Sequence, residues 1–142
     1  MSLERIAENK DYSVGVDAER KIVYLAVKGF WSEEETARDY VATLRAAVKK
    51  VSSPFAVVAD LTEMVTPSPV IGKYHEQIQQ ELVADGLCHT AEIWPTGAVL
   101  KMALQRYAKM SGNPVSGFSA EEAGKEAAIA QAKQWLAEQG YE

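Results

Sequence analysis

The residues most able to do chemistry lie where an apolar run, Phe55–Ala59, passes into a helical pattern. Asp60 and Glu63 follow the run, and the hydroxyl-bearing Thr66 and Ser68 come next, each before a proline. Two carboxylates at the carboxyl end of a strand could form an acid–base pair or bind a metal ion. Hydroxyls at the start of a helix could bind an anion or accept a phosphate. This segment is therefore the first candidate site.

Each of these residues also has a simpler structural role. Aspartate at a strand end commonly forms a turn, and no third metal ligand is evident beside the two carboxylates. Proline is favoured at the first helical position, so Ser68 before Pro69 is a good N-cap, with Thr66 before Pro67 as the second option. We therefore expect Ser68 to cap the helix, with phosphorylation of Ser68 secondary. We predict no catalytic group, no metal site and no cofactor.

The remaining reactive and aromatic side chains can likewise have either a functional or a purely structural role. Cys88 and His89 are adjacent, a spacing that does not match a zinc site, and His75 stands apart in a helical pattern. We expect a buried thiol and a surface imidazole, because a Cys–His nucleophile pair needs closeness in space that spacing does not establish. Trp31 and Trp94 both follow predicted strands. They could line an apolar pocket or close the end of the core.

The strands that position these residues are short and rich in β-branched and aromatic side chains. Tyr12–Asp17 and Lys21–Gly29 are separated by three residues, which predicts an antiparallel hairpin. The run Phe55–Ala59 shows no polar alternation, as expected for a strand covered on both faces. The other predicted strands are 90–94 and the short stretch 115–118.

Four segments with apolar residues at three- and four-residue steps predict amphipathic helices. The first and last open on capping boxes, Ser32 with Glu35 and Ser119 with Glu122, and Gly86 is the expected C′ residue of the second. The third is expected to end at about Met110. The residues expected on the inner faces are Ala37, Tyr40, Val41, Leu44, Ala47, Val48 and Val51, then Val70, Ile71, Tyr74, Ile78 and Leu82, then Val99, Leu100, Ala103, Leu104 and Tyr107, and finally Ala128, Ala132, Trp135 and Leu136.

The alternation of strands and helices predicts an α/β fold in a single domain spanning residues 1–142. Strands separated by helices pair in parallel through right-handed crossovers. We therefore predict a mixed, mostly parallel sheet of about five strands with an antiparallel N-terminal hairpin, covered by four main helices. A chain of 142 residues buries roughly 68–70% of its unfolded surface, which is enough for a stable core without disulfides or a structural metal ion.

Composition excludes several classes of function. The net charge is −5 and no basic cluster exceeds Lys49–Lys50, which argues against nucleic-acid binding. No run of eighteen apolar residues exists, so no membrane span is predicted, and the N-terminus lacks an apolar signal core. A single cysteine precludes an internal disulfide and fits a reducing compartment, so a cytoplasmic location is predicted.

The order of elements resembles a STAS domain, the fold of bacterial anti-sigma-factor antagonists, and more closely the SpoIIAA-like branch. Three stretches carry the resemblance: "IVYLAVKGFWSEEE", "FAVVADLTEM" and "GFSAEEAGKEAAIAQAKQWL". In the antagonists, a partner kinase phosphorylates the serine of an Asp-Ser pair before the second helix, and the phosphate abolishes partner binding. Here Thr66 to Ser68 occupy that place. The aspartate is missing and two prolines intrude, so the hydroxyl is kept but the recognition sequence is not.

These observations favour a non-catalytic binding or regulatory module. It would recognise a protein partner, or a small apolar or anionic ligand, near the start of the second helix, and a homodimer is one form it could take. One alternative is a small enzyme using Asp60 and Glu63, or Cys88. The other, implied by the resemblance, is a lipid or membrane-surface adaptor, but the helices lack the basic amphipathic face that this needs. The candidate binding residues are Trp31, Asp60, Thr66, Ser68 and Trp94.

Overall fold

The computed structural model of the protein describes residues 3–141, without the side chains of residues 122 and 123. One mixed sheet of six strands runs through it in sequence order. Strands β1 to β3 pair antiparallel, and β3 to β6 pair in parallel. The strands are β1 (Glu4–Glu8), β2 (Tyr12–Asp17), β3 (Ile22–Val27), β4 (Phe55–Asp60), β5 (Leu87–Trp94) and β6 (Val115–Ser119). The predicted α/β fold is confirmed, with one strand more than expected.

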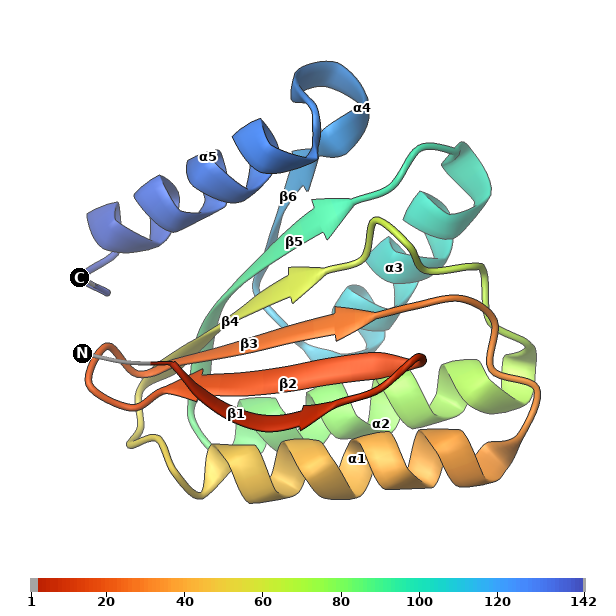
Figure 1. Ribbon diagram of the computed structural model, residues 1–142, viewed down its shortest axis with the longest axis horizontal. Helices are drawn as coiled ribbons and strands as arrows, with labels where there is room; N and C mark the ends of the chain where they lie inside the picture. The colour runs from red at the N-terminus through yellow and green to blue at the C-terminus, as the bar shows by residue number, and fades with distance from the viewer. Residues whose placement is uncertain (1–2, 142) are drawn as a thin grey trace.

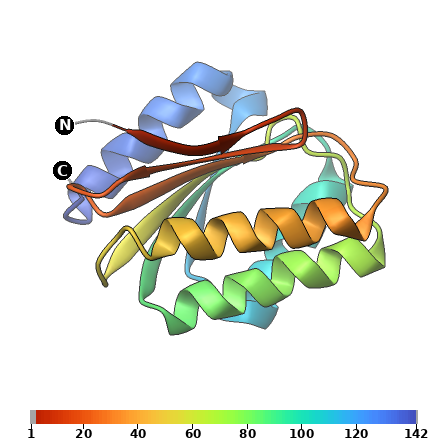
Figure 2. The ribbon, with the colours of Figure 1, turned by 60° about the horizontal axis from the view of Figure 1, so that its bottom comes forward.

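The helices form two layers on opposite faces of this sheet (Figures 1 and 2). One face is covered by α1 (Glu34–Val48), α2 (Pro69–Ala84) and α3 (Ala98–Ser111), and the other by α5 (Lys125–Glu138). A single turn, α4 (Ala120–Ala123), precedes α5. Each layer closes its own apolar core, and the larger core lies under α1 to α3. The four predicted main helices are therefore present.

Strand β1 is the element that periodicity did not predict. Its sequence, "ERIAE", places Ile6 and Ala7 side by side instead of alternating them with polar residues. The pairing with β2 shifts register between Arg5 and Ala7, so a bulge interrupts the two-residue period. Strand β1 is therefore held mainly by its backbone pairing with β2, because it has no fully buried face of its own.

Both predicted capping boxes are wrong. Helix α1 begins one residue later than expected, with Glu33 at the N-cap position and no side-chain cap. Glu34, the first residue of α1, accepts a hydrogen bond from the Tyr74 hydroxyl of α2 at 2.9 Å. Ser119 stands at the N-cap of α4, but its hydroxyl is buried without a hydrogen-bond partner. The Glu122 side chain lies outside the described part. The long last helix starts only after Gly124, whose φ of 85° interrupts the helical backbone.

Two predicted inward residues point outward. Val70 and Val99 are 51% and 70% exposed, whereas their successors, Ile71 and Leu100, are buried. Successive helical residues are rotated by about 100°, so a residue next to the centre of the buried face already turns toward solvent. The predicted helix end near Met110 and the role of Gly86, with its φ of 116°, agree with the structure.

Helix α5 docks on the sheet as predicted, through a stripe of small residues. Ala128, Ala132 and Leu136 are completely buried against β3, β4 and β5. Trp135 is only half-buried, with its ring centroid 5.9 Å from that of Phe118 and 5.7 Å from that of His89. Leu136, and not Trp135, is therefore the main anchor of α5.

Replacing Leu136 with alanine should destabilise the protein by about 2–5 kcal/mol, because the substitution leaves a cavity in a closed core. Trp135→Ala should cost less, because the indole is partly solvated in the native state. Gln134→Ala, at an exposed position of the same helix, is the matched control. Urea denaturation of the three variants measures the order, and an unchanged midpoint for Leu136→Ala would refute the docking.

Candidate functional site

The start of α2 shows the cap that its sequence predicted. Ser68 has an extended backbone, with φ −64° and ψ 161°, and its Oγ accepts a hydrogen bond from the Ile71 amide at 3.4 Å. Pro69 takes the first helical position, where a missing N–H costs nothing. Thr66 is half-buried in the loop and does not cap the helix. The capping role of Ser68 is confirmed.

The two carboxylates at the end of β4 are already occupied by neighbours. Asp60 Oδ1 accepts hydrogen bonds from the Thr62 amide at 3.0 Å and the Thr62 hydroxyl at 2.6 Å, which makes Asp60 the turn former. Lys125 Nζ lies 3.3 Å from Asp60 Oδ2 and 3.8 Å from Glu63 Oε2. Within the described residues, no group of three histidine, cysteine or acidic side chains could hold a metal ion. The two carboxylates thus tie the first residue of α5 to the sheet.

The expectations for the thiol and the imidazole were wrong. Cys88 is exposed near the start of β5, beside a register shift in its pairing with β4. His89 is half-buried, and its Nδ1 lies 3.1 Å from the Tyr141 hydroxyl. His75 is buried on the inner face of α2. The signal for His75 was present in the sequence, because it lies four residues after Ile71 and three before Ile78.

Trp31 and Trp94 hold separate places on the same side of the sheet. The Trp31 indole donates to the backbone oxygens of Asp11 and Lys28, and its ring packs against Tyr40 and His75 at centroid distances of 5.1 and 5.3 Å. The Trp94 indole donates to Glu92 Oε1 at 2.9 Å. Neither ring lines the cavity under α2. A binding role for either tryptophan stays a prediction.

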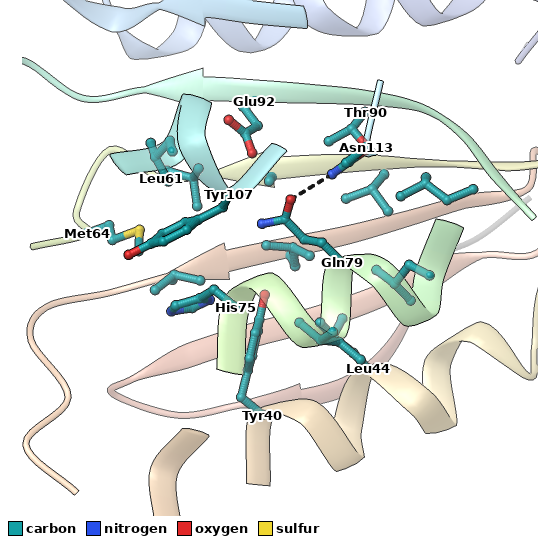
Figure 3. A pocket seen from close by; sticks show the side chains of 18 residues that line it. Tyr40, Leu44, Leu61, Met64, His75, Gln79, Thr90, Glu92, Tyr107 and Asn113 are labelled. Atoms are coloured by element: carbon teal, nitrogen blue, oxygen red, sulfur yellow. Dashed lines mark hydrogen bonds between the residues drawn. The ribbon is translucent and has the colours of Figure 1, made fainter. Parts of the chain in front are cut away.

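A cavity of about 40 Å³ lies between the sheet and helices α1 to α3 (Figure 3). Most of its lining is aliphatic, and it includes Met64 from the loop before α2. One group of polar side chains on its wall is satisfied internally. Thr90 Oγ1 donates to Asn113 Oδ1 at 2.7 Å, and Asn113 Nδ2 donates to Gln79 Oε1 at 3.1 Å.

A second polar group on the cavity wall consists of ionisable side chains from three different elements. Tyr40 comes from α1, His75 from α2 and Glu92 from β5, and all three are buried. Burial raises the pKa of Glu92 to about 7, although the hydrogen bond from Trp94 acts in the other direction. Burial lowers the pKa of His75 to about 4. Burial, and then the negative charge of Glu92, raise the pKa of Tyr40. At neutral pH the imidazole and the phenol are therefore uncharged, while the Glu92 carboxyl titrates.

Comparison with known proteins identifies the fold. No protein-family model matches the chain, and no curated protein sequence matches it. Among solved structures, SiaC of Pseudomonas aeruginosa is similar, with a TM-score of 0.55 and 10% sequence identity. The superposition covers 84% of this chain and 99% of SiaC. At this identity the likeness shows a shared fold, which agrees with the α/β architecture predicted from the sequence.

The stability of the protein should depend on pH through Glu92. Its folded pKa of about 7 exceeds the ordinary value of 4.5, so folding favours the protonated acid. The stabilisation is complete below pH 4.5 and is lost as the pH rises through 7, by about 3 kcal/mol. Glu92→Gln should remove this loss, so the stability of the variant relative to the wild type should rise between these pH values.

Urea denaturation at a series of pH values measures the difference between the two proteins. His75 acts with the opposite sign, because its pKa is lowered from 6.5 to about 4. Its stabilisation is present above pH 6.5 and is lost as the pH falls through 4, but it is common to both proteins and cancels in the difference. Glu138→Gln, at an exposed carboxylate at the end of α5, is the control and should follow the wild type. A stability difference for Glu92→Gln that does not change with pH would contradict the prediction.

Proposed function

We propose that the protein is a non-catalytic regulatory module that binds a protein partner through the surface at the start of α2. We define this start-of-α2 surface by Phe30, Val65, Ser68 and Val70. The observation that carries the proposal is the exposure of three large apolar side chains at one place: Phe30 is 52% exposed, and Val65 and Val70 are each 51% exposed. Exposed apolar side chains that gather beside a helix start mark an interaction site more often than isolated ones do.

Backbone contacts hold the two loops of this surface side by side. The Gly29 amide donates to the Glu63 oxygen at 2.7 Å, and the Val65 amide donates to the Gly29 oxygen at 3.2 Å. Gly29 and Met64 also form an isolated parallel bridge. Phe30 and Val65 follow these paired residues directly, and Val70 lies in the first turn of α2. The surface is therefore built on fixed backbone, as a recognition site requires.

The resemblance of the sequence to the antagonist family supports a regulatory interpretation. In the antagonist family that the sequence resembles, a partner kinase phosphorylates a serine before the second helix, and Ser68 occupies that place here. The similarity to SiaC supports the same fold. We propose a protein partner ahead of a small apolar or anionic ligand, because the exposed apolar groups lie on the outside of the loops. A homodimer stays a prediction.

The positions of the candidate catalytic groups favour a binding role over a catalytic one. Asp60 and Glu63 share Lys125, which keeps both carboxylates paired. Cys88 lies near the amino end of β5, whereas Asp60 lies at the carboxyl end of β4. Because these two strands are parallel, the two side chains are at opposite ends of the strands. No helix within residues 3–141 is long and apolar enough to cross a membrane. The exposed Glu33 and Glu63 near the start-of-α2 surface would repel anionic lipid, which disfavours the adaptor alternative.

Val70→Glu tests the surface, and Val99→Glu is its matched control. Both valines are exposed second residues of their helices, where a negative charge suits the helix N-terminus, so neither change should lower stability. Purified variants are cross-linked in extract of the native cell, and the captured proteins and cross-linked residues are identified by mass spectrometry. We expect a protein cross-linked near α2 that wild type and Val99→Glu retain and Val70→Glu loses. Equal retention by both variants would refute the proposed surface.

The two substitutions at Ser68 separate capping from a phosphorylation switch. Ser68→Ala should lose roughly 0.5–2 kcal/mol of stability, because the Ile71 amide loses its acceptor. Ser68→Asp should be nearly neutral, because aspartate also caps and its charge suits the helix start. Thermal melts measure both effects, and light scattering on the same samples gives the oligomeric state. We expect Ser68→Asp to retain the partner. A partner lost only with Ser68→Asp, at unchanged stability, would instead establish the antagonist mechanism.

A further inference from the structure

The cavity under α2 presents polar atoms that the protein leaves without partners. Tyr40, His75 and Glu92 are 4%, 6% and 3% exposed, and all three line the cavity (Figure 3). Among the described residues, no hydrogen bond reaches the Tyr40 hydroxyl or either ring nitrogen of His75, and Glu92 has a single donor, Trp94. Polar groups away from bulk water are normally paired, so two groups without a partner and a carboxyl with one donor, all lining one cavity, indicate a bound ligand.

The charged groups on the cavity wall indicate which charge a bound ligand would carry. Glu92 is the only acidic side chain on the wall, and no lysine or arginine of the described residues lines it. His75 is uncharged at neutral pH, because burial lowers its pKa. A buried carboxylate without a cation is unfavourable, and bound water alone supplies hydrogen bonds but no compensating charge. An anion would be repelled by Glu92, and the described residues offer a metal ion no group of three histidine, cysteine or acidic side chains.

The remaining wall suits an ammonium group. The neutral imidazole of His75 offers a lone pair, and the Tyr40 hydroxyl can accept a hydrogen bond. Aromatic faces attract cations, and Tyr40 and Tyr107 both belong to the wall. A volume of 40 Å³ holds about three waters at roughly 10–15 Å³ each, and thus a molecule of about two to four non-hydrogen atoms.

We propose that the cavity binds a small protonated amine, whose ammonium group pairs with Glu92 in the space that His75 and Tyr40 also line. The ligand would bridge three elements, because Tyr40 lies on α1, His75 on α2 and Glu92 on β5. This site is separate from the start-of-α2 surface, and its test does not require the protein partner.

The test is an NMR titration of ¹⁵N-labelled protein with methylammonium chloride, with sodium chloride at equal ionic strength as the reference. At a pH of about 8 the Glu92 carboxyl is ionised. We expect saturable shifts centred on Tyr40, His75 and Glu92, which weaken as the pH falls below about 7 and Glu92 becomes protonated. Ethanol and acetate, as neutral and anionic probes of similar size, should give no saturable shift there.

Two variants assign the effect to the cavity. Glu92→Gln should weaken methylammonium binding at least about tenfold, which corresponds to the loss of the charged partner. Its own spectrum verifies that it is folded. Glu138→Gln removes an exposed carboxylate at the end of α5 and should bind like the wild type. The proposal is overturned if methylammonium gives no saturable shift at the cavity, if Glu92→Gln binds as tightly as the wild type, or if ethanol produces the same shifts.

Discussion

The packing of α2 between its two neighbouring helices and the sheet is the constraint on which the rest of the structure depends. Its inner face carries Ile71, Ile78 and Leu82 into the larger core. Gly72 allows a close approach to α3, because a Cβ at this position would lie 2.6 Å from the Tyr107 hydroxyl. Arg45 of α1 binds Glu81 of α2 with two hydrogen bonds of 2.8 Å. These contacts fix the rotation of α2 about its own axis and so decide which residues face inward.

That fixed rotation gives α2 two chemically different faces. Val70 lies on the outer side, next to the capped N-terminus and the loop that carries Val65. His75 and Gln79 lie on the inner side, against the cavity. A helix held in this way can present a partner surface and a buried polar site within two turns. The inner site also has a cost, because it keeps an imidazole and a carboxyl away from water, and it is retained only if the surrounding packing is stable enough to carry it.

The two helix layers are connected through the end of β4. Asp60 is the last residue of that strand and forms an ion pair with Lys125, the first residue of α5, on the other face of the sheet. The next residues of the chain, Leu61 and Met64, already line the cavity under α2. The segment between β4 and α2 therefore contacts both layers. Its position at the carboxyl ends of parallel strands is where open α/β sheets usually bind their ligands.

The elements whose signals are local can be predicted from the amino-acid sequence. Runs of apolar, β-branched and aromatic residues predicted β2 to β6, three- and four-residue periods predicted the four long helices, and the Ser68–Pro69 pair predicted where α2 begins. The alternation of strands with helices was enough to predict a mixed sheet, because chain connectivity restricts how such units pair. It did not predict β1, whose bulge breaks the two-residue period, or the start of α1, where no side chain caps the helix.

Only the tertiary structure decided which titratable groups are buried and what surrounds them. Cys88 is exposed and His75 is enclosed, against expectation, because a register shift turns one and the neighbours of α2 cover the other. The cavity is lined by Tyr40, His75 and Glu92, which are far apart in the sequence and lie on three elements. Local sequence patterns specify which face of a helix or strand is apolar. Burial, charge and pairing depend on the elements that pack against that face, and those contacts form only when the whole chain is folded.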